Sequence, residues 1–155
     1  MHHGGYQSTV HVQVHVGSVD EKPDEQGIAH FVEHITFLGS NKRDLVSGYG
    51  GRSNAYTDFQ HTIFHVDVPT ADASGKSLVG LTIDMLAEVA FGAEFLISRI
   101  EKERKAVLAE AQMMNTIEYR MDCQLLKHLH EENALGYRFP IGMVDQVRLP
   151  EASRL

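Results

Sequence analysis

The stretch GIAHFVEHITF at residues 27–37 places two histidines and a glutamate inside an otherwise apolar run. His30 and His34 are four positions apart, so on a helix they share one face and lie one turn apart. Glu33 stands beside the second histidine, where its carboxylate reaches the same space. The apolar neighbours predict a largely buried helix, in which unpaired polar groups are costly. The three polar groups are therefore either the polar side of an amphipathic helix or partners of something that they bind together.

A metal ion is the most direct partner for this spacing. Two imidazoles one turn apart can bind one zinc ion, and a zinc hydrolase also needs an open position for water and a carboxylate that accepts its proton. The order is H-x-x-E-H, the inverse of the common H-E-x-x-H. A pattern with three fixed positions also arises by chance in a chain with 10 histidines. Taken alone, it favours coincidence or a hydrogen-bonded core histidine.

Composition excludes several classes of protein. The 155 residues suffice for one domain with a hydrophobic core, and the net charge of −7 argues against a nucleic-acid-binding module. Cys123 is the only cysteine, which rules out an internal disulfide, and we expect it to be a small buried residue. No apolar run approaches the roughly 18 residues of a membrane span. The first residues resemble neither a signal nor a transit peptide, and we assign His2 and His3 no role.

Residue periodicity predicts an α+β fold in which helices pack on a mostly antiparallel sheet, within a single domain over residues 1–155. A flexible, glycine-rich approach precedes the second strand, and Ser98 with Glu101 forms a capping-box signature at the start of a long helix. The tail holds one short helix at most. The expected strands are 8–16, a strand entered through SNAYT at 53–57, and 60–69; the expected helices are 25–38, 78–91, 98–117 and 119–132.

A second set of polar residues lies in the long helix that starts near Ser98. With 100° per residue, Glu103 and Glu110 fall in the apolar, core-facing stripe. Two carboxylates on a buried face need partners. A metal ion for one and a metal-binding histidine for the other would satisfy both. The alternative is a pair of internal salt bridges to arginines elsewhere in the chain. The other members of the expected stripe are Ala106, Val107, Met113, Met114 and Ile117, and the candidate arginines are Arg52, Arg120 and Arg138.

These residues together resemble the pitrilysin-type, or inverted-zincin, metallopeptidases. That family combines H-x-x-E-H with a distant metal-binding glutamate and a further glutamate seven positions before it. Here His34 and Glu110 are 76 positions apart, and Glu103 precedes Glu110 by seven. The resemblance implies one zinc ion per chain, with His30, His34 and Glu110 as ligands. It makes Glu33 the general base and Glu103 the carboxylate behind a ligand histidine.

Longer stretches are similar to the branch of this family that processes imported precursors in the chloroplast stroma. They include HFVEHITFLGS, GGRSNAYTDFQHTIFH and RFPIG, and the similarity spans residues 27–142. It implies a zinc metalloendopeptidase of the stroma that removes transit peptides, which are basic and suit a chain of net charge −7. It also implies that Asn54, Ala55 and Tyr56 lie on an edge strand that pairs with an extended substrate; ordinary strand-entry residues are the alternative.

The chain is shorter than members of this family, in which a C-terminal half closes over the zinc-bearing half. We therefore expect an incomplete domain that needs such a half, or another subunit, to complete its active site. A truncated, non-catalytic module that binds zinc and an extended peptide or partner chain is the alternative function.

The remaining histidines come in pairs with strand or helix spacing. Two residues four apart on one strand lie about 13 Å apart, too far to share an ion. Two residues two apart on a helix face different directions. We therefore expect structural or solvent-facing roles for His11, His15, His61, His65, His128 and His130.

Overall fold

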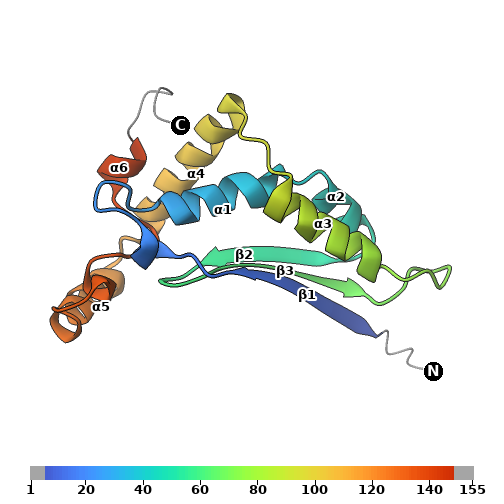
Figure 1. Cartoon of the computed structure of the whole chain (residues 1–155), viewed down its shortest axis with the longest axis horizontal. Coiled ribbons are helices and arrows are strands. Elements are labelled where there is room, and N and C mark those ends of the chain that lie inside the picture. Colours follow the sequence, from blue (N-terminus) through green and yellow to red (C-terminus); the bar gives the residue numbers. More distant parts are fainter. Residues whose placement is uncertain (1–5, 149–155) are drawn as a thin grey trace.

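Helices cover one face of a three-stranded sheet in the computed structural model, which describes residues 6–148 (Figure 1). The strand order is β1-β3-β2, and both pairings are antiparallel. This confirms the predicted α+β class. Within the described residues, no helix is long and apolar enough to cross a membrane. The strands are β1 (Gln7–Val14), β2 (Arg52–Thr57) and β3 (Thr62–Pro69); the helices are α1 (Ile28–Gly39), α2 (Lys42–Gly48), α3 (Val79–Phe91), α4 (Ile97–Met114), α5 (Ile117–Leu129) and α6 (Val144–Arg148), with 3-10 turns at Ser18–Asp20 and Ala134–Gly136.

The central strand β3 alternates strictly between buried and half-buried residues, as the period of two requires. Its buried side chains Phe64, Val66 and Val68 form the core with Met85 and Leu86 of α3. The sheet therefore has one face packed under α1, α2 and α3 and one face that these helices leave open (Figure 1).

Helix α1 is held at its first turn by a side chain that precedes it. The Glu21 carboxylate accepts hydrogen bonds from the backbone N–H groups of Gly27 (2.9 Å) and Ala29 (2.8 Å). It thus satisfies donors that a helix start leaves without intrahelical partners. Gly27 adopts a φ of 97°, a conformation that favours glycine. At the other end, the Arg99 guanidinium donates to the carbonyl of Gly39 at 3.4 Å.

A segment near the end of the described chain packs against this helix start. The backbone of Gly142 lies so close to Gly27 that a Cβ on Gly142 would be 2.3 Å from the Gly27 Cα. The Gln26 N–H donates to the Gln146 side chain at 2.6 Å, and the Ser18 hydroxyl donates to the Arg138 carbonyl at 2.5 Å. Residues 120 positions apart therefore fix the entry of α1 together.

The predicted elements are present, but several boundaries differ. β1 ends at Val14 rather than at residue 16, and α1 begins at Ile28 rather than near residue 25. The Ser98 capping box is wrong, because α4 begins at Ile97 after an extended Leu96 and no side chain caps it. The flexible, glycine-rich approach is wrong in its first part, because residues 42–48 form helix α2. His2 and His3 lie outside the described residues.

Candidate metal centre

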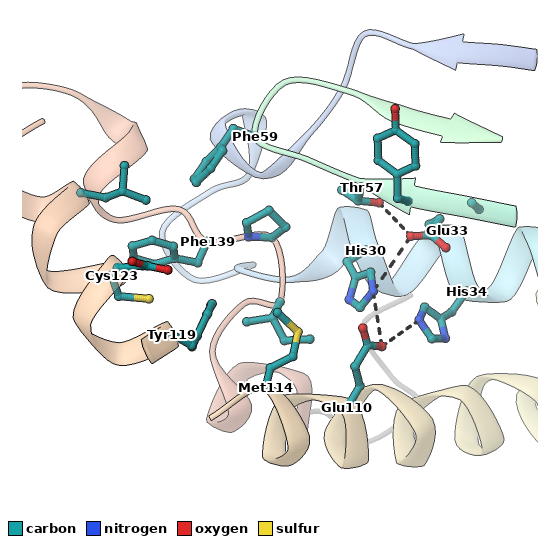
Figure 2. A pocket seen from close by; sticks show the side chains of 16 residues that line it. His30, Glu33, His34, Thr57, Phe59, Glu110, Met114, Tyr119, Cys123 and Phe139 are labelled. Atoms are coloured by element: carbon teal, nitrogen blue, oxygen red, sulfur yellow. Dashed lines mark hydrogen bonds and ion pairs between the residues drawn. The ribbon is translucent and has the colours of Figure 1, made fainter. Parts of the chain in front are cut away.

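Three predicted ligands converge from two helices. Glu110 Oε2 on α4 lies 3.4 Å from His34 Nε2 and 3.7 Å from His30 Nε2. One donor atom from each of the three residues lies within 4.8 Å of the other two. Figure 2 shows the Glu110 side chain pointing from α4 toward both imidazoles of α1. Two segments 76 positions apart thus present two nitrogens and one carboxylate oxygen to the same point.

This arrangement fits zinc. Around a tetrahedral ion with bonds of about 2.0–2.1 Å, neighbouring ligand atoms are about 3.3–3.4 Å apart. The distances from Glu110 to the two imidazoles are close to that value. Burial lowers the pKa of His30, and the adjacent His34 lowers it further, which favours the neutral imidazole that binds metals. Two histidines and one carboxylate also leave a fourth position open, as in catalytic zinc sites.

Glu103 lies behind His34. Its Oε2 is 3.6 Å from His34 Nδ1, on the side of the ring opposite the nitrogen that faces Glu110. Glu103 is 2% exposed, so its carboxylate is removed from water. At 3.6 Å the contact is too long for a hydrogen bond, but the carboxylate stands on the side of the ring where an outer partner of a ligand histidine lies. The expected burial of both glutamates is only half right, because the Glu110 side chain is 41% exposed.

The burial predicted for the apolar stripe of α4 is also wrong over most of its length. Val107 is fully buried, but the stripe beyond it stays open to solvent, with Met113 80% exposed. The buried residues of α4 are Ile100, Glu103 and Val107, all within its first three turns. The exposed members are Ala106, Met113, Met114 and Ile117. Among the candidate arginines, Arg120 donates to Asn115 rather than to a glutamate.

Glu33 lies beside the cluster and is 6% exposed. Its Oε2 is 4.0 Å from His30 Nε2 and accepts a hydrogen bond of 3.1 Å from the Thr57 hydroxyl. Burial raises the pKa of the Glu33 carboxyl, while the nearby His34 and the Thr57 hydrogen bond act against that rise. A buried carboxylate with a raised pKa, held at one oxygen, is suited to accept and return a proton.

A pocket of about 430 Å³ opens beside the metal ligands. Its far side carries three aromatic side chains (Figure 2), and the ring centre of Phe139 lies 6.2 Å from that of Phe59 and 6.3 Å from that of Tyr119. Cys123, expected to be a small buried residue, is half-buried and lines this pocket. The other side is formed by β2 and the ligand helix. The lining residues are His30, Glu33, His34, Ala55, Tyr56, Thr57, Phe59, Glu110, Met114, Tyr119, Asp122, Cys123, Leu126, Phe139, Pro140 and Ile141.

The residues expected to contact substrate lie on an edge strand. In the described sheet β2 pairs with β3 alone, so one of its backbone edges is unpaired. Ala55 and Tyr56 line the pocket, whereas Asn54 accepts a hydrogen bond from the Ala55 N–H at 3.0 Å and is not among the lining residues. The structure thus brings two of the three to the metal ligands.

Two functional positions were missed in the sequence. Thr57 ends β2 as an ordinary strand residue, and only the fold brings its hydroxyl to Glu33. Glu21 belongs to an acidic loop, and its distance of six positions from Gly27 matches no capping motif. Thr57 lies in the SNAYT stretch that was already singled out, but no local pattern indicates Glu21.

Comparisons with known proteins agree with this geometry. The sequence profile of the insulinase family, peptidase family M16, matches residues 2–139. The chain is 57% identical over 145 residues to the chloroplastic stromal processing peptidase of Pisum sativum; the match covers 94% of this chain and 12% of that protein. It is 32% identical over 157 residues to an uncharacterized zinc protease of Streptomyces coelicolor, covering 96% of this chain and 32% of that protein.

Among solved structures, the periplasmic protease PqqL of Escherichia coli is similar with a TM-score of 0.82 at 26% identity. The similarity covers 94% of this chain and 17% of PqqL. The chain therefore matches one limited part of each of these longer proteins.

Proposed function

The chain belongs to the insulinase family of peptidases, family M16, and from that premise we propose that it carries the zinc centre of a metalloendopeptidase. The observation behind this proposal is the convergence of His30, His34 and Glu110 on one point, with Glu33 beside it. We assign the three converging residues as ligands of one zinc ion per chain. A relative named as a zinc protease supports the choice of metal.

In the proposed reaction, the residues of this chain hold and move one proton. Zinc, when bound, would polarise the peptide carbonyl and acidify a water molecule. Glu33 accepts the proton of that water, whose oxygen adds to the peptide carbonyl, and then returns the proton to the leaving amine. Thr57 holds one Glu33 oxygen during this exchange. Glu103 keeps the His34 ring in place from behind.

We infer that the substrate is an extended, basic peptide, with transit peptides of chloroplast precursors as the specific class. Support comes from the name of the pea relative and from the net charge of −7. Such a peptide would add to the free edge of β2 by main-chain hydrogen bonds and lie along Ala55 and Tyr56. Asn54 would contact the substrate once its side chain releases the Ala55 N–H. The chloroplast stroma is the corresponding location.

We treat residues 1–155 as a single domain of that enzyme, which works with a C-terminal half or another subunit. The chain spans only 12% of the pea relative and 17% of PqqL, so its partner surfaces belong to the proposal as well.

A chimaera tests the function in its full context. The chain replaces the matching residues of the pea stromal processing peptidase, and zinc content and cleavage of a transit-peptide precursor are measured with and without Glu33→Gln. We expect the parent chimaera to bind one zinc and cleave. Glu33→Gln should keep the zinc and lose about 10²–10⁴-fold in rate, the usual contribution of a general base.

Glu101→Gln is the matched control, since Glu101 lies on the exposed side of α4 with a side chain 52% exposed. Cleavage by the Glu33→Gln chimaera at the parent rate would refute the assignment of the base. A parent chimaera that binds zinc and never cleaves would favour the non-catalytic, zinc-binding module instead.

A further inference from the structure

A second pair of histidines meets outside the metal centre, where β1 ends and β3 begins. Val14 is the register partner of Thr62, so the next residues, His15 and His61, face each other across the strands. Their ring centres are 5.0 Å apart with an interplanar angle of 66°. Strand spacing separates His61 from His65, but antiparallel pairing brings His61 to His15.

The candidate metal centre provides a reference for this geometry within the same chain. The His30 and His34 rings are 4.7 Å apart at 85°. Two imidazoles on one tetrahedral ion, with bonds of about 2.0–2.1 Å, have ring centres about 5 Å apart. The spacing of His15 and His61 therefore matches both the reference pair and the requirement of a shared ion.

A carboxylate also lies behind one member of each pair. Asp58 Oδ1 is 3.6 Å from His61 Nδ1, the same distance that separates Glu103 Oε2 from His34 Nδ1. Asp58 is itself fixed, because its Oδ1 accepts from the backbone N–H groups of Gln60 (2.7 Å) and His61 (2.6 Å). A carboxylate on Nδ1 orients the ring and leaves Nε2 for an ion.

We propose that His15 and His61 form a second site, at the surface, for a divalent transition-metal ion, with Asp58 as the carboxylate behind His61. This site is independent of the proposed peptidase function. It has two protein ligands instead of three, and His15 is exposed, so water completes the coordination and binding is weaker than at the metal centre. Imidazole pairs of this kind bind Cu²⁺, Ni²⁺ and Zn²⁺, with Cu²⁺ the tightest.

An ion at this site would join β1 to the turn that carries pocket residues. The turn already pairs with the segment after β1, because the Ser18 N–H donates to the Asp58 carbonyl and the Val19 N–H to the Phe59 carbonyl. Phe59 lines the pocket, and the turn follows directly on Thr57. Occupancy therefore stabilises the pocket wall next to Thr57, the residue whose hydroxyl donates to Glu33.

The test uses Ni²⁺ alone and a background that removes competing imidazoles. In the full chain, His30 and His34 are replaced by Gln to abolish the metal centre, and His2 and His3 are replaced to abolish terminal chelation. Isothermal titration with NiCl₂ should then show one ion per chain. Either His15→Gln or His61→Gln should abolish that binding, and Asp58→Asn should weaken it about tenfold.

His128→Gln is the control, because His128 is an exposed histidine on α5 and should leave binding unchanged. Far-UV circular dichroism and the urea midpoint verify folding of each variant, and His15→Gln carries the test if His61→Gln disturbs the turn. Absence of nickel binding in the background would overturn the proposal. So would binding that survives both substitutions, or that is lost only with His11→Gln or His65→Gln, which are register partners on the same strands.

Discussion

Replacing Glu103 by Gln should separate metal affinity from fold stability. The side chain is 2% exposed, and its Oε2 is 3.6 Å from His34 Nδ1. When His34 binds zinc through Nε2, its Nδ1–H would face the Glu103 carboxylate, whose negative charge strengthens the ring as a ligand. Gln keeps the shape and one acceptor oxygen but removes that charge.

Glu103→Gln should weaken zinc binding without lowering the free energy of unfolding of the metal-free chain. Loss of a carboxylate behind a ligand histidine typically weakens metal binding by about 10–100-fold, which corresponds to about 1.4–2.7 kcal/mol of binding free energy. In the metal-free protein, an ionised carboxylate at this depth is unfavourable because it has left water. The neutral amide relieves that penalty, so the free energy of unfolding without metal should be unchanged or higher.

Zinc affinity is measured by competition with a chromophoric chelator at neutral pH, and stability by urea unfolding of the metal-free chain. Glu101→Gln is the control on the same helix, since the Glu101 side chain is 52% exposed and contacts Arg104 one turn away at 3.4 Å. That pair contributes at most about 0.5 kcal/mol and lies away from the histidines. The reasoning is refuted if Glu103→Gln binds zinc like the parent chain while Glu110→Gln does not.

Three further changes test other parts of the structure. Gly142→Ala should lower the free energy of unfolding by about 2–5 kcal/mol in urea, because φ is 72° and the new Cβ would lie 2.3 Å from the Gly27 Cα; a loss below about 1 kcal/mol would contradict this packing. Thr57→Val in the chimaera should slow cleavage about tenfold at unchanged zinc affinity, since one hydrogen bond to the Glu33 carboxylate is lost. Thr57→Ser should restore the rate, and equal loss in both variants would argue against a hydroxyl role. Burial opposes the charge of Asp58, but backbone hydrogen bonds from the turn outweigh it and lower the pKa below the ordinary 3.8. The folded state then binds the proton less readily than the unfolded state, so this stabilisation is present above pH 3.8 and is lost as the pH falls through the lowered pKa. Urea unfolding between pH 2 and 5 measures this loss, and the free energy of unfolding of Asp58→Asn should depend less steeply on pH than that of the parent chain.

The sequence contained enough to group the proposed metal ligands, because both parts of the candidate site are helical and periodic. The one-turn spacing of His30 and His34 and the two-turn spacing of Glu103 and Glu110 are local properties. Local spacing fixes which side chains share a helix face, and burial of apolar neighbours decides which face turns inward. The convergence of the two helices required the observed fold.

What escaped prediction depends on contacts between distant residues. Thr57 reaches Glu33 only because β2 passes beside α1, and His15 meets His61 only because β1 and β3 are antiparallel in one register. A one-residue slip of that register would move His61 to the other face. Helix α2 was missed for a different reason: its glycine-rich surroundings suggested a loop, yet Val46 is 1% exposed and holds the helix in the core.

The exposure of the predicted stripe on α4 shows the limit of helical periodicity. A turn of 100° per residue places Met113 and Glu110 on the same side of the helix as Val107, but of these three only Val107 is buried. Periodicity identifies a face of the helix, whereas the length over which that face is covered depends on the partner. Glu110 lies where this coverage ends, which leaves the metal ligands open to the pocket.

The contacts between the entry of α1 and residues 138–146 also determine when the site can form during synthesis. A nascent chain acquires both ligand helices once residue 114 has left the ribosome. Gly142 and Gln146 must follow before Gly27 and Gln26 gain their last partners. At roughly 5–20 residues per second, that interval lasts seconds. During it, the helix that carries the histidines still lacks the contacts that residues 142 and 146 make with its start. A metal ion bound during this interval would link α1 to α4 before the contacts at the start of α1 are complete.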